Sequence, residues 1–596
     1  MASQTVADLI LSRLREWGVD TVFAYPGDGI NGMLAAFGRA DDEPRFIQSR
    51  HEEMSAFEAV GYAKFSGRLG VCMATSGPGA IHLLNGLYDA KLDHVPVVAI
   101  VGQTSRSAMG GSYQQEVDLK TLFKDVACYV QTVTVPEQLP NVLDRAIRIA
   151  VAERTVTALI VHSDVQELDY AAPTHDFKMV PSSVGVEWPD VSPDGDGIRQ
   201  AAEVLNSGKK VAMLIGDGAR GARNEVMEIA ELLGAGVAKA LLGKDVLSDE
   251  LPYVTGSIGL LGTRPSYEMM MDCDTLLTIG SSFPYTQFMP EFGQARGVQI
   301  DIDPKFIGMR YPYEVNVVGD AAKSLRALIP QIIRKEDRGW RESIEDKVQR
   351  WWETMGAEAM VDADPINPMR LFSELSERLP SNAMLSADSG SAANWYARQL
   401  RFRGEVRGSL SGTLATMGPG VPYAIGAKFA HPDRPAIALV GDGAMQMNGM
   451  AELITVKRYW QEWSDPRAVV AVLHNGDLNQ VTWEMRAMGG APRFGGSQSL
   501  PDVDYAAFAT SLGLLGVTVE DPDEVGAAWE QALAADRPAV LDVHTDPDVP
   551  PIPPHATFEQ AKDLLEALAK GDEDAWGIVV EGVKTKVQEF LPHRNG

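Results

Sequence analysis

Short apolar runs alternate with amphipathic stretches along the whole chain. VPVVAIVG, AIALV and AVVAVLH are examples of such runs, and each leads into a Gly-containing or polar turn. Near-continuous apolar runs are typical of strands buried on both faces of a parallel sheet, and their alternation with amphipathic segments indicates βαβ units. The pattern therefore predicts an α/β fold built from doubly wound, Rossmann-like domains with mostly parallel sheets.

Three segments interrupt this alternation and divide the chain. Residues 174–197 are polar and rich in Pro, residues 330–365 are charged and rich in Trp and Glu, and PDVPPIPP precedes a helix-like C-terminal stretch. Polar, Pro-rich stretches are typical of linkers. We expect three doubly wound domains, at 1–175, 190–335 and 360–548, joined by a linker and a helical connector and followed by a helical tail at 549–596.

Charge and cysteine content narrow the class of protein. The 53 basic and 81 acidic residues give a formal charge of −28, which would repel a polyphosphate strand, so we expect no nucleic-acid partner. Cys72, Cys128 and Cys273 are odd in number and far apart, and they form no disulfide or zinc pattern. The first residues have no signal-peptide pattern, and no apolar run is long enough to cross a bilayer. We expect a cytoplasmic protein.

Polar residues at two predicted strand ends indicate a metal site. Gly-Asp-Gly at 441–443 follows the run AIALV, and Asn475 follows AVVAVLH. Ligands of doubly wound sheets bind beyond the carboxyl ends of the strands, and Mg²⁺ prefers oxygen ligands. We expect Asp442, the side-chain carbonyl of Asn475 and a backbone carbonyl at Asp477 to hold Mg²⁺, with diphosphate oxygens and water completing its shell. Gly-Asp-Gly also occurs at 216–218, so the motif alone does not identify a metal site. The Asn at the end of the next strand supports the site at 441–443.

Gly-Asp-Gly followed by an Asn at the next strand end resembles the thiamine diphosphate signature. The whole chain resembles the family of pyruvate oxidase, pyruvate dehydrogenase (quinone) and acetolactate synthase, and it is most similar to the pyruvate oxidases. The resemblance implies a pyrimidine-binding domain at 1–175, a central FAD-binding-like domain at 190–335 and a diphosphate- and Mg²⁺-binding domain at 360–548. The interval between Asp442 and Asn475 is longer than is usual in the oxidases, and we place the extra residues in a polar loop, KRYWQEWSDPRA.

The resemblance also assigns the groups that activate and bend the cofactor. In this family a Glu at a strand-to-helix turn hydrogen-bonds a pyrimidine ring nitrogen. Glu52 in SRHEEMSAFEAVGYAK matches that position, with Glu53 as the competing candidate. Met417 in SGTLATMGPGVPYAIGA matches the bulky side chain under the bend of the cofactor. Further residues expected to contact thiamine diphosphate are Pro26, Gly27, Thr75, Asn85, Gly390, Ser391, Thr416, Gly441, Gly443, Ala444 and Met445.

Three segments of the middle domain resemble the flavin-contacting segments of the pyruvate oxidases: SIGLLGTRP, GSSFPYTQF and QIDIDP. An acidic residue after a strand, such as Asp301, suits a ribose hydroxyl. FPYTQF stands where acetolactate synthases characteristically have an Arg- and Asp-containing sequence. The alternative is an empty structural domain, as in the decarboxylases without flavin. The residues expected to bind FAD are Gly259, Leu260, Leu261, Ser281, Ser282, Phe283, Pro284, Tyr285, Asp301 and Asp320.

The substrate side departs from the pyruvate oxidase pattern. GGSYQQEVD has Gln-Gln where the family has Phe-Gln, and Gln480 stands where the oxidases have an aromatic residue. Glu484 keeps a carboxylate found in the oxidases, whereas Trp483 matches the Trp of acetolactate synthases after a shift of one residue. We expect Gln115 and Glu484 to be catalytic together with Glu52, in a more polar pocket. Our hypothesis is that the substrate or the electron acceptor differs from that of plain pyruvate oxidase.

The resemblance implies oxidative decarboxylation of pyruvate with thiamine diphosphate, Mg²⁺ and FAD. Two alternatives stay open: an acetolactate synthase-type carboligase that joins two 2-oxo acids, and a decarboxylase of another 2-oxo acid. A cofactor-binding regulatory protein is disfavoured, because all of the cofactor residues are present. The family also implies a homodimer or homotetramer with active sites between subunits. Quinone-reducing relatives meet the membrane through an amphipathic C-terminal segment, but this tail is acidic, so we expect it to pack on the protein's own surface.

Overall fold

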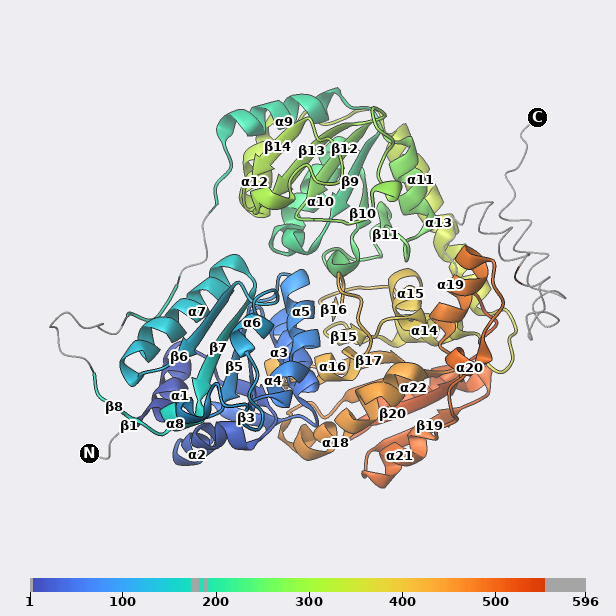
Figure 1. The fold of residues 1–596 in the computed structure, drawn as a ribbon. Helices are drawn as coiled ribbons and strands as arrows, with labels where there is room; N and C mark the ends of the chain where they lie inside the picture. The colour runs from blue at the N-terminus through green and yellow to red at the C-terminus, as the bar shows by residue number, and fades with distance from the viewer. Residues whose placement is uncertain (1–3, 173–181, 187–190, 552–566, 568–596) are drawn as a thin grey trace.

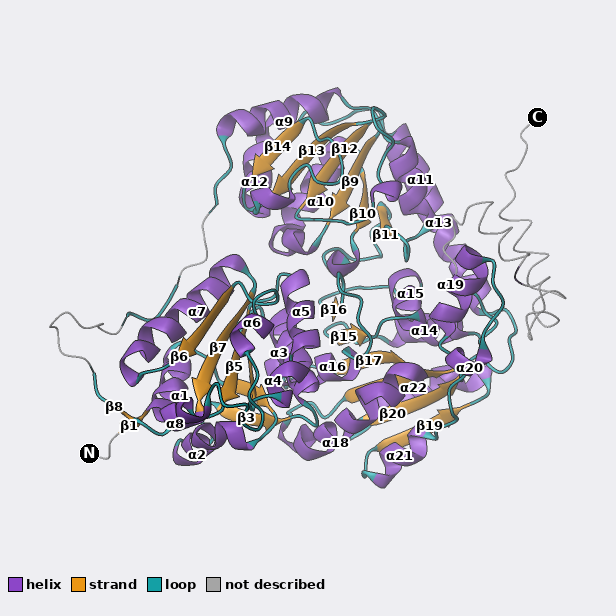
Figure 2. Ribbon diagram, viewed as in Figure 1, coloured by secondary structure: helices purple, strands orange, loops and turns teal. Residues whose placement is uncertain are grey.

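The protein is described by a computed structural model that covers residues 4–172, 182–186, 191–551 and 567. Within these residues the chain forms three six-stranded sheets, each with parallel strands and flanked by helices (Figures 1 and 2). The prediction of an α/β fold with three domains and parallel sheets is confirmed. The predicted helical tail at 549–596 lies almost wholly outside the described residues.

The N-terminal domain contains the first sheet. Its strands consist largely of buried Val, Ile, Phe and Ala. Apolar side chains point to both faces of the sheet because helices cover both faces. The sheet has the order β3 (Arg45–Gln48), β2 (Thr21–Ala24), β4 (Gly70–Ala74), β5 (Val97–Gln103), β7 (Val156–His162), β6 (Tyr129–Val133). Its helices are α1 (Val6–Glu16), α2 (Asn31–Arg39), α3 (Glu52–Ser66), α4 (Pro78–His82), α5 (Leu84–Leu92), α6 (Leu119–Leu122), α7 (Leu139–Glu153) and α8 (Ser163–Gln166). The short strands β1 (Gln4–Thr5) and β8 (Asp169–Tyr170) pair antiparallel.

The C-terminal domain repeats the topology of the N-terminal one. Its sheet has the order β16 (Arg407–Ser409), β15 (Met384–Ala387), β17 (Ala436–Gly441), β18 (Ala468–His474), β20 (Ala539–His544), β19 (Leu515–Val519). The six strands of each sheet can be counted in chain order. In both sheets the second of the six forms one edge (β3 and β16) and the fifth forms the other (β6 and β19). The helices are α14 (Pro368–Arg378), α15 (Ser391–Arg398), α16 (Gly420–Ala430), α17 (Asp442–Ala444), α18 (Met450–Tyr459), α19 (Asn479–Gly489), α20 (Gly495–Gln498), α21 (Tyr505–Ser511) and α22 (Val525–Leu533).

The central domain has a different strand order. Its sheet runs β11 (Val254–Ser257), β10 (Gly236–Lys239), β9 (Val211–Ile215), β12 (Thr275–Ile279), β13 (Arg296–Asp301), β14 (Val315–Val318). The chain therefore reverses direction across the sheet between the adjacent strands β9 and β12, which is where ligands of such sheets bind. The helices are α9 (Gly195–Ser207), α10 (Arg223–Leu233), α11 (Arg264–Asp272) and α12 (Ala321–Leu328), and α13 (Gly339–Ala359) forms the predicted helical connector.

Helices α3 and α16 join the two outer domains. A Cβ on Gly61 of α3 would lie 2.7 Å from Tyr423 Cα, and a Cβ on Gly426 of α16 would meet the backbone carbonyl oxygen of Glu58. The two helices therefore touch backbone to backbone, and one hydrophobic core contains residues of both domains. This contact fixes the N-terminal sheet against the C-terminal sheet, and the carboxyl ends of both carry the predicted site residues.

Two expectations from the sequence can be compared directly with the described residues. The predicted polar loop KRYWQEWSDPRA is wrong in its first half: residues 457–459 end α18 and residues 460–462 form a 3₁₀ turn, because Tyr459 and Trp463 are buried in the core between the outer domains. Both flanking strands keep their ends, as expected. Within the described parts of the chain, no helix combines the length and the apolar character that crossing a bilayer requires.

Candidate functional site

Glu52 is the first residue of α3 and is buried, with 7% of the residue exposed. His51 caps the helix: its ring Nδ1 accepts a hydrogen bond from the Glu53 backbone N–H, so the helix begins at Glu52. Glu52 Oε2 lies 2.9 Å from Nδ1 of His82, and the rings of His51 and His82 lie 4.3 Å apart. A histidine that sequence reasoning missed thus fixes the carboxylate. Its signal was its place three residues after the TSGPG turn.

The turns that follow β2 and β4 pack closely beside Glu52. The Gly29 backbone N–H donates to Thr75 Oγ1 at 2.9 Å, which ties the two turns together. A Cβ on Gly27 would lie 2.5 Å from Thr75 Cβ, and a Cβ on Gly79 would lie 3.0 Å from Glu52 Oε1. Glycine is therefore required at both positions if the turns are to close and the carboxylate is to stay accessible. The structure brings Gly27, Thr75 and Glu52 together.

Gln115 lies against the same turn. Its φ of +61° is in the left-handed region, which is uncommon for a residue other than glycine. Ser76 Oγ donates to Gln115 Oε1 at 2.7 Å, and a Cβ on Gly77 would lie 2.9 Å from Gln115 Cβ. The loop from β5 to α6 thus holds the predicted substrate amide beside the TSGPG turn, in the same cluster as Glu52. Strained backbone of this kind is concentrated at functional sites.

Asp442 and Asn475 lie at the carboxyl ends of the neighbouring strands β17 and β18. Asp442 Oδ2 accepts hydrogen bonds from the backbone N–H groups of Asn475 at 2.9 Å and Gly476 at 2.6 Å, and Oδ1 accepts from Gly443 at 2.8 Å. Burial raises the pKa of Asp442 to about 6, although these hydrogen bonds favour the charged form. A cation beside this carboxylate would offset the cost of burying its charge.

Asp477 adds further oxygen atoms to this group. Its backbone N–H donates to Asn475 Oδ1 at 3.0 Å, and its Oδ1 accepts from Arg493 Nε at 3.0 Å. Its buried Oδ2 has no hydrogen-bond partner among the described residues. Burying a carboxylate oxygen without a partner is costly, so this atom indicates that the site takes a positively charged group or water.

Met417 lies over the Gly-Asp-Gly turn: its Cε would be 3.5 Å from a Cβ on Gly443. The residue before it is tied to the N-terminal domain, because Asn85 Nδ2 donates both to Thr416 Oγ1 at 3.0 Å and to Glu53 Oε1 at 2.6 Å. The two predicted candidates for the activating acid therefore differ in their surroundings. Glu53 is held by Asn85, whereas Glu52 is held by His82 and lies beside Gly79.

Ser391, Gln480 and Glu484 belong to a polar group at the start of α19. Asn394 Nδ2 donates to Gln480 Oε1 at 2.5 Å, and Gln480 Nε2 donates to Glu484 Oε1 at 3.0 Å, one helical turn further on. Ser391 Oγ donates to Asn479 Oδ1 at 3.1 Å. The amide at position 480 thus orients the carboxylate of Glu484, a role that an aromatic side chain there would not fill.

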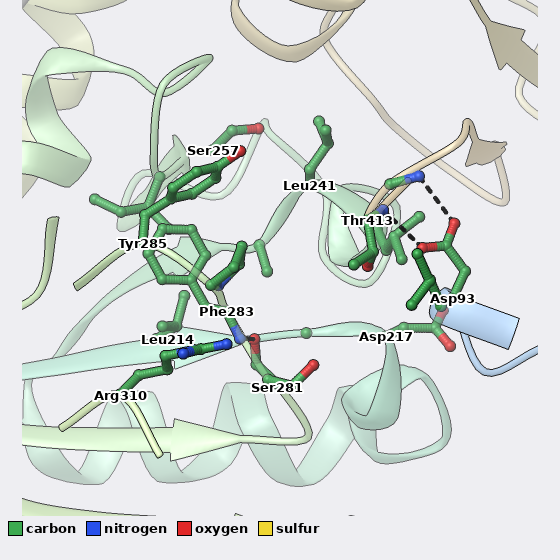
Figure 3. Close-up of a pocket in the computed structure, with 18 of the residues that line it drawn as sticks. Asp93, Leu214, Asp217, Leu241, Ser257, Ser281, Phe283, Tyr285, Arg310 and Thr413 are labelled. Carbon is green, nitrogen blue, oxygen red and sulfur yellow. Dashed lines mark hydrogen bonds between the residues drawn. The ribbon is translucent and has the colours of Figure 1, made fainter. Parts of the chain in front are cut away.

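A cavity of about 1000 Å³ lies where the three domains meet. It opens at the carboxyl ends of β9 and β12, the point at which the central strand order reverses. Figure 3 shows the rings of Phe283 and Tyr285 beside Arg310 on one wall. Gly259 lies beside the Phe283 ring. The predicted flavin residues in the lining are Leu260, Leu261, Ser281, Ser282, Phe283, Pro284, Tyr285, Asp301 and Asp320.

The outer domains complete the cavity. Gly390, Gln480 and Glu484 of the C-terminal domain line it, so the predicted substrate residues and the predicted flavin residues border one space. Residues that sequence reasoning missed contribute the rest of the wall, among them Asp93 and Thr413, whose hydrogen bond is drawn in Figure 3. They lie in separate domains, and nothing in the local sequence around either one indicates the contact.

The predicted site residues therefore form three groups. Glu52, Thr75 and Gln115 cluster with the glycine turns of the N-terminal domain. Asp442 and Asn475 cluster with the groups around Met417 in the C-terminal domain. The third group lines the cavity and consists of the predicted flavin residues of the central domain with Gly390, Gln480 and Glu484. Asn85 links the first two groups within the chain through Glu53 and Thr416.

Three family models match the chain, one in each domain. They are the thiamine pyrophosphate enzyme N-terminal TPP binding domain at residues 4–122, the central domain at 198–328 and the C-terminal TPP binding domain at 388–543. A Bacillus subtilis (strain 168) protein whose name describes it as containing thiamine pyrophosphate is 37% identical over 96% of both chains. Pyruvate oxidase of Lactiplantibacillus plantarum is 28% identical over 91% of this chain and 88% of its own. The large subunit of acetolactate synthase isozyme 2 of Escherichia coli (strain K12) is 30% identical over 94% and 100%.

Proposed function

This chain belongs to the thiamine pyrophosphate enzyme family, and on that premise we propose that it catalyses oxidative decarboxylation of pyruvate or a closely related 2-oxo acid, with FAD as the electron acceptor. The observation that supports this best is the cavity shared by the three domains. It extends from the predicted flavin segments of the central domain to Gly390, Gln480 and Glu484. A flavin bound there would lie next to the predicted substrate side chains.

The residues present fit thiamine diphosphate and Mg²⁺. Asp442 and Asn475 offer hard oxygen ligands at two adjacent strand ends, and Oδ2 of Asp477 has no hydrogen-bond partner among the described residues. Gly390 and Ser391 begin α15, where backbone N–H groups face outward and suit a diphosphate. We propose that Asp442, Asn475 and the backbone at Asp477 hold the metal ion and that the turn of Gly390 holds the phosphates.

Thiamine diphosphate supplies, when bound, an electron sink for decarboxylation of a 2-oxo acid. We assign Glu52 the proton that is shared with a ring nitrogen of the aminopyrimidine, because it begins α3 at the strand-to-helix turn where the family places the activating acid. His82 orients that carboxyl group from its other oxygen. Met417 provides the apolar support over the Gly-Asp-Gly turn. Gln115 and Glu484 are assigned to the substrate, the first as a hydrogen-bond partner and the second as a carboxylate that moves a proton.

The cavity also fits a flavin dinucleotide in character and size. Two aromatic rings, Phe283 and Tyr285, offer apolar surface, and Asp301 at the end of β13 suits a ribose hydroxyl. Burial raises the pKa of Asp301, so hydrogen bonding to a ligand hydroxyl would offset an existing cost. A volume of about 1000 Å³ lies at the upper end of ordinary ligand sites.

We further propose a homodimer or homotetramer with active sites between subunits, in which the Glu52 group of one chain faces the Asp442 group of another. This part of the proposal rests on the resemblance to the family, which implies active sites between subunits. The domain bounds 1–175, 190–335 and 360–548, a cytoplasmic location and the absence of a nucleic-acid partner remain part of the proposal.

The test is the visible spectrum of the purified protein under anaerobic conditions, before and after addition of pyruvate. Bleaching of bound flavin bands is the expected result. A flavin that stays oxidised while acetolactate accumulates would replace this proposal with a carboligase, the reaction named for several relatives. If the purified protein contains no flavin, the central domain has a structural role and does not bind FAD. Turnover on a panel of 2-oxo acids then identifies the substrate.

A further inference from the structure

Two histidines and an aspartate meet at the carboxyl ends of the parallel strands β18 and β20. His474 and His544 are the last residues of these strands and lie opposite each other in register, and Asp542 stands two positions before His544. His474 and Asp542 are buried, and His544 is half-buried. One ring nitrogen of each histidine and one carboxylate oxygen of Asp542 lie within 4.8 Å of one another.

The geometry of the three groups suits a single metal ion. His474 Nδ1 lies 2.9 Å from Asp542 Oδ1, and the rings of His474 and His544 are 4.3 Å apart with planes 35° from parallel. Two imidazoles that share one tetrahedral ion at Zn–N distances of about 2.0–2.1 Å have ring centres roughly 5 Å apart. The two rings would therefore have to separate by roughly 1 Å to bind one ion.

A second layer of partners supports the same three groups. The far nitrogen of His474, Nε2, lies 3.3 Å from Asp502 Oδ1, and the Tyr505 backbone N–H donates to the other oxygen of Asp542 at 3.0 Å. Metal-binding histidines typically donate their other ring N–H to a carboxylate, which fixes the ring. The arrangement of Asp502, His474 and Asp542 has this form.

We propose that His474 Nδ1, Asp542 Oδ1 and a ring nitrogen of His544 bind a borderline divalent cation such as Zn²⁺ or Co²⁺, with water as the fourth ligand. Nitrogen ligands distinguish this position from the neighbouring oxygen site at Asp442 and Asn475, which suits Mg²⁺. The ion would tie the ends of β18 and β20 together directly before Asn475.

The test uses the full-length protein in excess Mg²⁺, so that the oxygen site is saturated, and titrates it with Co²⁺. We expect one equivalent of Co²⁺ per chain, with visible d–d absorption bands that Zn²⁺ abolishes. His544→Val should remove the bands, and Asp502→Asn should weaken binding by about tenfold through loss of the outer carboxylate. His431→Asn, at a half-buried histidine of the same domain, serves as the matched control and should bind as wild type does.

Absence of the bands in wild type, or equal bands in wild type and His544→Val, would overturn the proposal. Far-ultraviolet circular dichroism of each variant checks that the fold is kept. If His544→Val does not fold, Asp542→Asn replaces it, and its unchanged cobalt spectrum would count equally against the site. The result is independent of thiamine diphosphate, because the titration needs only the protein and metal ions.

Discussion

Asp93 of the N-terminal domain accepts a hydrogen bond from the backbone N–H of Thr413 in the C-terminal domain at 2.8 Å. The same carboxylate accepts from the Gly412 N–H at 2.8 Å and from Lys64 Nζ at 2.7 Å. Lys64 also donates to the Leu410 carbonyl at 2.7 Å. One buried ion pair thus holds, from the other domain, the loop that leads to Thr416 and Met417 and borders the cavity.

Asp93→Asn should destabilise the protein strongly. Both side chains of the pair are buried, with 7% of Lys64 and 0% of Asp93 exposed, so the variant leaves a buried ammonium without its partner. Removal of one partner of a buried pair costs about 3–5 kcal/mol. The midpoint of urea denaturation at neutral pH measures the loss. Asp125→Asn, which removes the exposed pair with Lys91, is the matched control, and an equal shift in both variants would contradict the assignment.

Gly61→Ala should loosen the contact between the outer domains. Its Cβ would lie 2.7 Å from Tyr423 Cα, a backbone atom that cannot rotate away. Overpacking of this kind costs about 1–3 kcal/mol of unfolding free energy. Gly356→Ala in α13 is the control, since a Cβ there meets nothing within 4 Å, and Ala should leave stability unchanged or raise it by up to about 1 kcal/mol. Thermal denaturation of both variants decides between these outcomes.

Glu52→Gln should abolish most turnover and leave cofactor binding intact. The amide keeps the shape of the side chain but cannot donate a carboxyl proton, and loss of one acid–base group typically costs about 10²–10⁴-fold in rate. Turnover with a 2-oxo acid and calorimetric binding of thiamine diphosphate give the two readouts. Glu53→Gln tests the competing candidate and should keep most of the activity, because Asn85 already holds that carboxylate. If Glu53→Gln loses activity and Glu52→Gln keeps it, Glu53 is the activating acid.

A buried carboxylate pair between the outer domains should make stability depend on pH. Burial, and then the charge of Glu452, raises the pKa of Glu58 well above its usual 4.5, while Arg50 acts weakly in the opposite direction. An acid whose pKa is higher in the folded state binds its proton more tightly when folded. Its contribution to stability is therefore complete below pH 4.5 and is lost as the pH rises toward the folded pKa.

Glu58→Gln should remove this dependence, because the amide stays neutral at every pH. The wild type should lose up to about 1.4 kcal/mol of unfolding free energy per pH unit above pH 4.5 that the variant keeps. Denaturation midpoints measured from pH 5 to pH 8 for both proteins provide the comparison. Parallel curves would show that the two carboxylates do not share a proton in the folded chain.

The sequence predicted the parts of the fold that depend on local pattern. Buried parallel strands are near-continuous apolar runs, so the strands at 436–441 and 468–474 and the polar residues after them could be located, and with them Asp442 and Asn475. The loop expected at 457–468 was wrong in its first half, because the apolar faces of Tyr459 and Trp463 pack between domains that no local window includes.

Contacts between distant segments could not be predicted from one sequence. His82 orients Glu52 across two helices, Glu58 meets Glu452 across two domains, and His474 reaches His544 through adjacent strands that are far apart in the chain. Each residue alone looks like an ordinary polar residue on a helix or strand. These pairs form only when the helices and strands pack together in the folded chain, so local sequence patterns do not reveal them.

The cavity borders all three domains, which has a consequence for how the protein melts. An occupant that touches residues as distant as Asp93, Phe283 and Glu484 acts as a noncovalent cross-link between the core shared by the outer domains and the core of the central domain. Its binding energy is lost when either core unfolds, so the loaded protein should melt as one cooperative unit. Without it, the central core can open independently, and calorimetry would record separate transitions.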